Sequence, residues 1–273
     1  MTPREVFEDT FRIAELLIQL YRLLENDHLE TEGERVEAIR RLLRCPPDEQ
    51  VQVLANEVFL GCIRENAYIP PGRLKRQSLE HLLRQAVVSA CTAYEVFLLC
   101  TLRVNLQPLI RLIEEGKLAL RGKTADHFRE LKVSVQELLN LIHREDRAVA
   151  LTTKFVNYVK HKNLGAMQAL ETVGTLLGIE QAWKQVCVRL KRDEEETQKL
   201  LQTAIQRRND IVHRADRDFD DDSLPRETIS LAYAEQVVDS IKHVCRGFDE
   251  LVNERMRQFL ADSVPREETV RHG

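Results

Sequence analysis

The run AVVSACTAYEVFLLCTL, residues Ala86–Leu102, decides the fold class of this chain. It is the most apolar stretch of the sequence, but it is shorter than a membrane span and carries Glu95 at its centre. We therefore expect a buried helix. Helical spacing extends it from about Leu74 towards Glu115, and Pro108 should kink or split that helix.

Helical periodicity continues on both sides of this run. In Pro3–Glu25 the apolar residues recur every three or four positions, which is typical of an amphipathic helix. The sequence NAYIPPG (Asn66–Gly72) is the clearest break, and we find no convincing strand and no internal repeat. We expect helices over Pro3–Glu25, Arg35–Arg44, Asp48–Ile63, Leu74–Glu115, Ala125–His143, Asp146–His161, Ala166–Leu177 (closed by Gly178), Glu180–Leu190, Asp193–His213 and Pro225–Ala261.

The composition supports an all-α helical bundle. Among 273 residues there are only 10 Gly and 8 Pro, and aromatic residues make up 5%, whereas sandwiches and barrels need many turns. Charged residues make up 31%, which is too many for a membrane protein, so we expect no membrane association. The net charge of −4 excludes a non-specific polyanion binder, so any contact with nucleic acid requires a local basic patch.

The cysteines and the N-terminus predict a cytoplasmic protein. No two of the six cysteines are spaced as C-x-x-C, and none has a histidine at zinc-ligand spacing, so we expect reduced thiols and no structural zinc. The start of the chain, MTPREVFEDTFRIAELL, carries acidic residues early and lacks a small-residue cleavage site, unlike a signal peptide.

Common catalytic motifs are missing from the sequence. There is no Gly-rich phosphate loop, dinucleotide fingerprint, G-x-S-x-G elbow or H-E-x-x-H motif, so we expect no cofactor. The acidic stretch FDDDS (Phe219–Ser223) could hold a divalent ion or form a solvated loop. Because it lacks the spacing and the glycine of an EF-hand, we expect no metal there.

The segment RRNDIVH, Arg207–His213, is the candidate site. At about 100° per residue, Arg208 falls in the stripe formed by Leu201, Ala204, Ile205 and Val212, where a hydrophobic residue is expected. Arg208 should therefore face a core, a groove or a partner. Asn209 and His213, four residues apart, share the neighbouring flank.

Two interpretations of this segment remain open. In one, Arg208 pairs with a buried acid, for which Glu95 is the obvious candidate, and His213 stabilises the helix end. In the other, Arg208 neutralises a phosphodiester, His213 moves protons to or from the attacking 2′-hydroxyl or the leaving 5′-oxygen, and Asn209 bonds the phosphate or holds the imidazole. The spacing alone cannot decide, because an Arg five or six residues before a His recurs at Arg22/His28, Arg76/His81, Arg121/His127 and Arg266/His272.

The stretch LLQTAIQRRNDIVHRADR (Leu200–Arg217) resembles the signature of HEPN-domain proteins, closest to the RiboL-PSP-HEPN group. Two further segments resemble that group in the same order, namely AVVSACTAYEVFLLCTL with its Glu and LLGIEQAWKQVCVRL (Leu176–Leu190) with its Trp. The resemblance covers about Leu79–Leu106 and Leu176–Val252.

The resemblance implies a bundle with a core of four to five helices, often a homodimer in which the two Arg/His motifs face each other. Many members are metal-independent endoribonucleases of toxin–antitoxin or anti-phage systems, which would give this chain RNA as substrate and an antitoxin or defence protein as a possible partner. Carried over, Arg208 and His213 would be catalytic, Asn209 would assist and Glu95 would orient Arg208. Arg207 and Arg214, which flank the motif, could hold the RNA backbone.

The resemblance also sets the expected domains and the alternative functions. We expect an N-terminal helical segment over 1–72, a HEPN-like domain over 73–262 with an insertion at about 116–165, and a polar tail over 263–273. Some HEPN proteins have lost activity, so a non-catalytic helical module for protein or nucleotide binding is the second hypothesis. An accessory subunit of a larger nuclease or nucleotidyltransferase system is the third. The acidic loop Asp216–Asp222 should repel RNA unless it moves or faces away.

Overall fold

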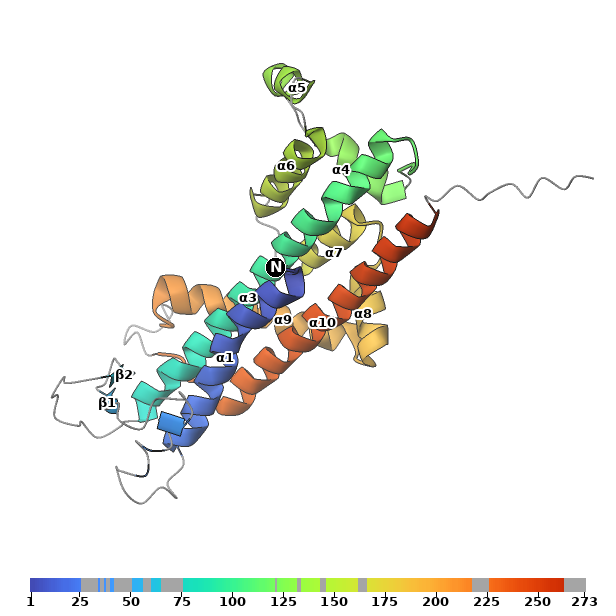
Figure 1. The fold of residues 1–273 in the computed structure, drawn as a ribbon. Coiled ribbons are helices and arrows are strands. Elements are labelled where there is room, and N and C mark those ends of the chain that lie inside the picture. The colour runs from blue at the N-terminus through green and yellow to red at the C-terminus, as the bar shows by residue number, and fades with distance from the viewer. Residues whose placement is uncertain are drawn as a thin grey trace, which may run out of the picture. The chain divides into compact units, whose positions relative to one another are not determined.

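The fold is all-α, as the composition and periodicity predict. The computed structural model describes residues 1–25, 34, 37, 40–41, 51–55, 60–64, 76–120, 122–131, 134–142, 146–161, 166–217 and 226–262. The helices are α1 (Pro3–Glu25), α3 (Arg76–Glu114), α4 (Gly122–Glu130), α5 (Val135–Ile142), α6 (Arg147–His161), α7 (Ala166–Leu176), α8 (Ala182–Leu190), α9 (Glu194–Arg214) and α10 (Leu231–Asp262) (Figure 1).

The chain divides into two compact units. The first contains residues 1–7, 94–202 and 243–273, and the second contains residues 8–93 and 203–242. The expected domain boundaries at 72 and 262 remain a prediction.

Aromatic side chains pack in the core of the first unit. The ring of Phe97 meets Phe7 and Phe248 edge to face, with centroids 5.5 and 6.4 Å apart. The helix α7 comes so close to the start of α8 that a Cβ on Gly174 would lie 2.5 Å from the Cβ of Ala182. The expected end of α7 at Gly178 is confirmed, because this residue takes φ +75° and the amide of Ile179 donates to the carbonyl of Gly174 at 2.8 Å.

Capping side chains explain several helix starts. The carboxylate of Asp146 accepts from the amide of Val149 at the start of α6, and that of Asp193 accepts from Glu196 at the start of α9. In α10 the hydroxyl of Ser230 accepts from the amide of Tyr233, so this helix begins later than the predicted Pro225.

The prediction of one helix over Ala125–His143 is wrong, because α4 ends at Glu130 and α5 begins at Val135. Ser134 and Glu137 form a capping box there. The hydroxyl of Ser134 accepts from the amide of Glu137, and the carboxylate of Glu137 accepts from the amide of Ser134.

The helix expected over Asp48–Ile63 is also wrong. The structure has two antiparallel strands instead, β1 (Val51–Ala55) and β2 (Leu60–Arg64), in a register that pairs Val53 with Cys62 (Figure 1). The alternation Val51-Gln52-Val53 favours a strand over a helix. The predicted break at 66–72 and the tail 263–273 lie outside the described residues, as does most of the helix expected over Arg35–Arg44.

The helix α3 runs unbroken through Pro108, so the expected split does not occur. Ala86, Val87, Ala90 and Leu102 are fully buried, as expected for a core helix. The helical stretch Leu79–Glu114 is longer than the apolar run Ala86–Leu102. Among the described residues, it is the one helix whose length and composition would allow it to cross a membrane. Half of its most apolar window is buried, and the core helix of a globular domain meets the same criterion.

Candidate functional site

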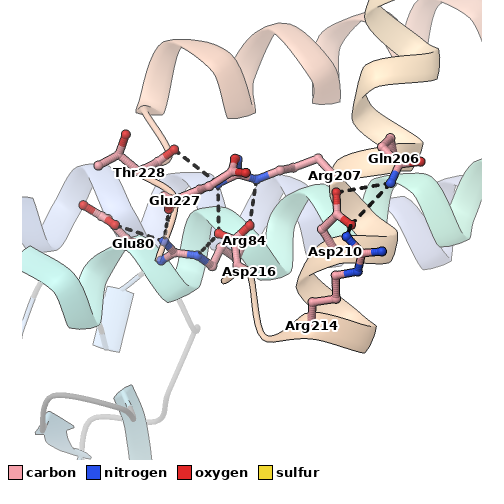
Figure 2. A network of polar contacts seen from close by, with 9 residues as sticks. All are labelled: Glu80, Arg84, Gln206, Arg207, Asp210, Arg214, Asp216, Glu227 and Thr228. Atoms are coloured by element: carbon pink, nitrogen blue, oxygen red, sulfur yellow. Dashed lines mark hydrogen bonds and ion pairs between the residues drawn. The ribbon is translucent and has the colours of Figure 1, made fainter. Parts of the chain in front are cut away.

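Asp216 is the centre of a polar network in the second unit. The Nε of Arg84, from α3, donates to Oδ2 of Asp216 at 2.5 Å. Arg207, from α9, approaches the same carboxylate side-on, with Nη2 2.9 Å from Oδ2 and Nε 2.9 Å from Oδ1. Figure 2 shows the two guanidinium groups converging on this carboxylate. The Asp216 side chain is only 1% exposed, so the carboxylate must be paired to be tolerated.

Two further carboxylates bind the same two arginines. Glu80 lies one turn before Arg84 on α3 and accepts from its Nη2 at 3.2 Å. Glu227 accepts from Nη1 of Arg207, and its backbone carbonyl accepts from Nη2 of Arg84 at 2.6 Å. Only Glu227 is largely solvent-accessible, with its side chain 54% exposed.

The backbone at the end of α9 explains how Asp216 enters the interior. After Arg214, residues Ala215 and Asp216 take φ values of +52° and +59°. Left-handed backbone costs a non-glycine residue on the order of 1 kcal/mol or more. The amide of Asp216 donates to the carbonyl of Asp210 at 3.0 Å and closes the helix, so the strained turn also caps α9.

The chain then returns beside this turn. Arg217 forms a β-bridge with Arg226, and the amide of Glu227 donates to the carbonyl of Asp216 at 3.0 Å. The acidic loop expected over 216–222 therefore differs at its first residue, since Asp216 is buried and paired. Residues 218–222 lie outside the described residues.

The three proposed catalytic residues lie on the last two turns of α9. Arg208 and Asn209 are half-buried, and Nη1 of Arg208 donates to Oδ1 of Asn209 at 2.9 Å. His213 is exposed four residues after Asn209, on the same flank. The expected apolar stripe holds for Leu201 and Ala204, which are buried, but Val212 is 53% exposed. The stripe thus reaches solvent at Val212, before α9 ends.

Glu95 differs from its expected setting. It lies in the core helix α3, but its own side chain is exposed. It belongs to the first unit and Arg208 to the second, so the orienting contact between them stays a prediction.

The two arginines expected to hold RNA have different surroundings. Arg207 forms ion pairs with Asp216 and Glu227, and its side chain is only 14% exposed. Arg214 is 61% exposed and lies 3.8 Å from Asp210, which also accepts from Gln206 (Figure 2). An exposed pair at this distance contributes little, so Arg214 can exchange its partner readily.

His81 borders the network and was not singled out from the sequence. Nη1 of Arg226 lies 3.0 Å from Nε2 of His81. A guanidinium can only donate, so this ring nitrogen accepts and the proton of the neutral ring sits on Nδ1. Burial, and then the charges of Arg84 and Arg226, lower the pKa of His81 below its ordinary value, against the weaker opposing effects of Glu80 and Asp216.

Arg84 and Asp216 are not predicted from the sequence either, although the apolar neighbours of Arg84 are a recognisable signal. In the stretch HLLRQAVV, Arg84 directly follows two leucines and stands shortly before Ala86-Val87-Val88, and a buried arginine there requires an acid. The partner is 132 residues away, within a run of acids that resembles a solvated loop.

Among the described residues, no group of three or more His, Cys, Asp or Glu side chains is gathered as a metal site. The stretch Phe219–Ser223 lies outside those residues.

No family model, no curated protein and no solved structure matches the chain.

Proposed function

We propose that the protein is a metal-independent endoribonuclease whose site is the C-terminal end of α9. The observation that carries this proposal is the arrangement of three side chains there. Arg208 is half-buried and bonded to Asn209, and His213 is exposed on the next turn. A cation, a carboxamide and an imidazole at one accessible helix end suit the cleavage of a phosphodiester without a metal.

The proposed reaction forms a bond from the 2′-oxygen to phosphorus and breaks the bond from phosphorus to the 5′-oxygen. The 2′-hydroxyl loses a proton and the 5′-oxygen gains one. His213 carries out one of these two transfers and water the other, and Arg208 stabilises the charge on the phosphoryl oxygens. Asn209 uses its Oδ1 to accept from Arg208, which leaves its NH₂ group to donate to a phosphoryl oxygen. The products are a 2′,3′-cyclic phosphate and a 5′-hydroxyl.

The HEPN resemblance supplies the biological setting of the proposal. It suggests a cytoplasmic homodimer with two facing Arg208/His213 pairs, acting in a toxin–antitoxin or anti-phage system beside an antitoxin or defence partner. Arg214 is the better candidate of the two flanking arginines for the RNA backbone, because Arg207 is already bound to two carboxylates.

RNA cleavage in the presence of EDTA tests the proposal. We expect the parent to produce new 5′-hydroxyl ends, and Arg208→Ala and His213→Ala each to lower the rate by at least 100-fold, because each removes a group that acts on the reacting phosphate. His127→Ala and Arg129→Ala, which remove the same two residue types from α4, should cleave like the parent. Equal cleavage by both α9 variants and the parent would refute the assignment.

A non-catalytic helical module is the second candidate, and the network around Asp216 favours it. Arg84 and Arg207 are neutralised within the chain, as expected for a structural ion cluster. Under this hypothesis Arg208→Ala weakens folding or partner binding, and neither the parent nor any variant cleaves RNA.

A further inference from the structure

Asp216 joins three parts of the second unit at one residue. Its carboxylate binds Arg84 of α3 and Arg207 of α9 (Figure 2). Its amide donates to Asp210 in the last turns of α9, and its carbonyl accepts from Glu227 of the returning chain. Glu227 also uses its side chain, its amide and its carbonyl in this network, but of the two carboxylates only that of Asp216 binds both Arg84 and Arg207.

These contacts fix the part of α9 that carries the proposed site. Arg207 directly precedes Arg208, so holding its guanidinium limits rotation of this turn about the helix axis. The carbonyl of Asp210, bound by the amide of Asp216, lies between Asn209 and His213. Side chains held by a buried, multiply bonded group keep their orientation better than side chains on a fraying helix end.

We infer that Asp216 is a positioning residue, which holds Arg208, Asn209 and His213 in register at the end of α9. Its effect on cleavage rests on the proposed endoribonuclease function. Its effect on the order of this helix end does not.

Glu227 provides a matched comparison because it binds the same guanidinium. Asp216 is 1% exposed and has two arginine partners, whereas the Glu227 side chain is 54% exposed and meets Nη1 of Arg207 alone. Water can replace the Glu227 carboxylate, but it cannot reach the place of the buried one. Only Asp216 should therefore hold the helix end.

Amide hydrogen exchange of Asp216→Asn and Glu227→Gln tests the inference without relying on activity. Asparagine tolerates left-handed backbone, so Asp216→Asn removes the charge and places an NH₂ group against an arginine without changing the turn. We expect the amides of residues 211–214 to exchange at least tenfold faster in Asp216→Asn and within twofold of the parent in Glu227→Gln. The amides of α7 and α8 should keep the parent's rates in both variants.

Three results would overturn the inference: unchanged exchange at residues 211–214 in Asp216→Asn, equal acceleration in both variants, or equal acceleration throughout the molecule. If Asp216→Asn does not fold, Arg207→Gln takes its place, since it frees α9 while the pair of Arg84 and Asp216 remains. The same tenfold local acceleration is expected there, and its absence contradicts the inference.

Cleavage kinetics provide the second readout. We expect Asp216→Asn to lower kcat about tenfold with KM within twofold of the parent, because misplaced catalytic groups slow the chemical step more than they weaken RNA binding. Glu227→Gln should retain the parent's kcat. A parent that does not cleave RNA refutes the proposed function, and the exchange experiment then decides the inference alone.

Discussion

Two arginines on α3 show how strongly burial changes the contribution of an ion pair. Arg84 and Asp216 are 2.5 Å apart, with side chains 4% and 1% exposed. Arg111 and Asp146 are 2.8 Å apart, with side chains 52% and 46% exposed. The geometry of the two pairs is similar, so a difference between them reflects the surroundings.

We expect Arg84→Met to lower the free energy of unfolding by about 3 kcal/mol or more, because it leaves the buried Asp216 with one arginine fewer. Arg111→Met should lower it by less than about 1 kcal/mol, because water solvates the charge that remains. Urea denaturation of both variants and the parent measures the difference. Equal losses would contradict the expectation that burial makes the pair of Arg84 and Asp216 contribute more than the exposed pair.

Separation along the sequence explains which site residues could be predicted. Arg208, Asn209 and His213 lie within six positions of one another, so a helix brings them together whatever the tertiary structure. Arg84 and Asp216 are 132 residues apart, and only the packed chain brings them into contact. The acids after Asp216 concealed its role, since a run of acids usually lies in solvent.

At the scale of elements, Pro108 is the notable exception within α3. Its ring nitrogen carries no hydrogen, so the carbonyl four residues earlier, on Val104, receives no helical bond from this position. The helix nevertheless continues to Glu114, because buried residues on both sides of the proline, including Leu106 and Leu109, hold it in the core.

Replacing Pro108 by alanine should therefore stabilise the protein. Pro108→Ala restores the missing donor and removes the ring, and the gain exceeds the added freedom of the unfolded chain. We expect the free energy of unfolding to rise by about 2 kcal/mol, as measured by urea denaturation. Gln107→Ala, at the neighbouring position, should change it by less than about 0.5 kcal/mol. A loss of stability in Pro108→Ala would show that the helix is bent there to fit its surroundings.

Elements were predictable where one periodic pattern ran without interruption. This holds for α1, α6 and α9, whose observed bounds lie within one residue of the expected ones. The separate start of α5 follows from Ser134 and Glu137, whose spacing marks a capping box that apolar periodicity alone does not reveal. The strands β1 and β2 were missed because short apolar runs suit a helix or a strand equally, and their pairing depends on contacts across the chain.

At the scale of the whole molecule, His81 should make stability depend on pH. The unfolded chain protonates this residue near its ordinary pKa of 6.5, whereas the folded chain, with its lowered pKa, takes up the proton only at lower pH. Between these values the unfolded state binds more protons, so the free energy of unfolding falls as the pH drops below 6.5.

Urea denaturation at pH 7.5, 6.5 and 5.5 checks this expectation. The parent should lose more stability than His81→Gln between pH 7.5 and 5.5, because glutamine does not titrate. Carboxylates contribute to both proteins alike, so the difference between them isolates His81. Identical pH profiles would mean that this imidazole is protonated as easily in the folded chain as in the unfolded one.

The bridge between Arg217 and Arg226 has a practical consequence for engineering the chain. It pairs the two residues that flank the segment 218–225 in the sequence. Because the bridge holds both ends of this connection, each doubling of its length adds only about 0.6 kcal/mol to the entropic free-energy cost of closing it. A fluorescent or affinity sequence inserted there should leave the helix end intact, which makes this position a suitable place to attach a reporter.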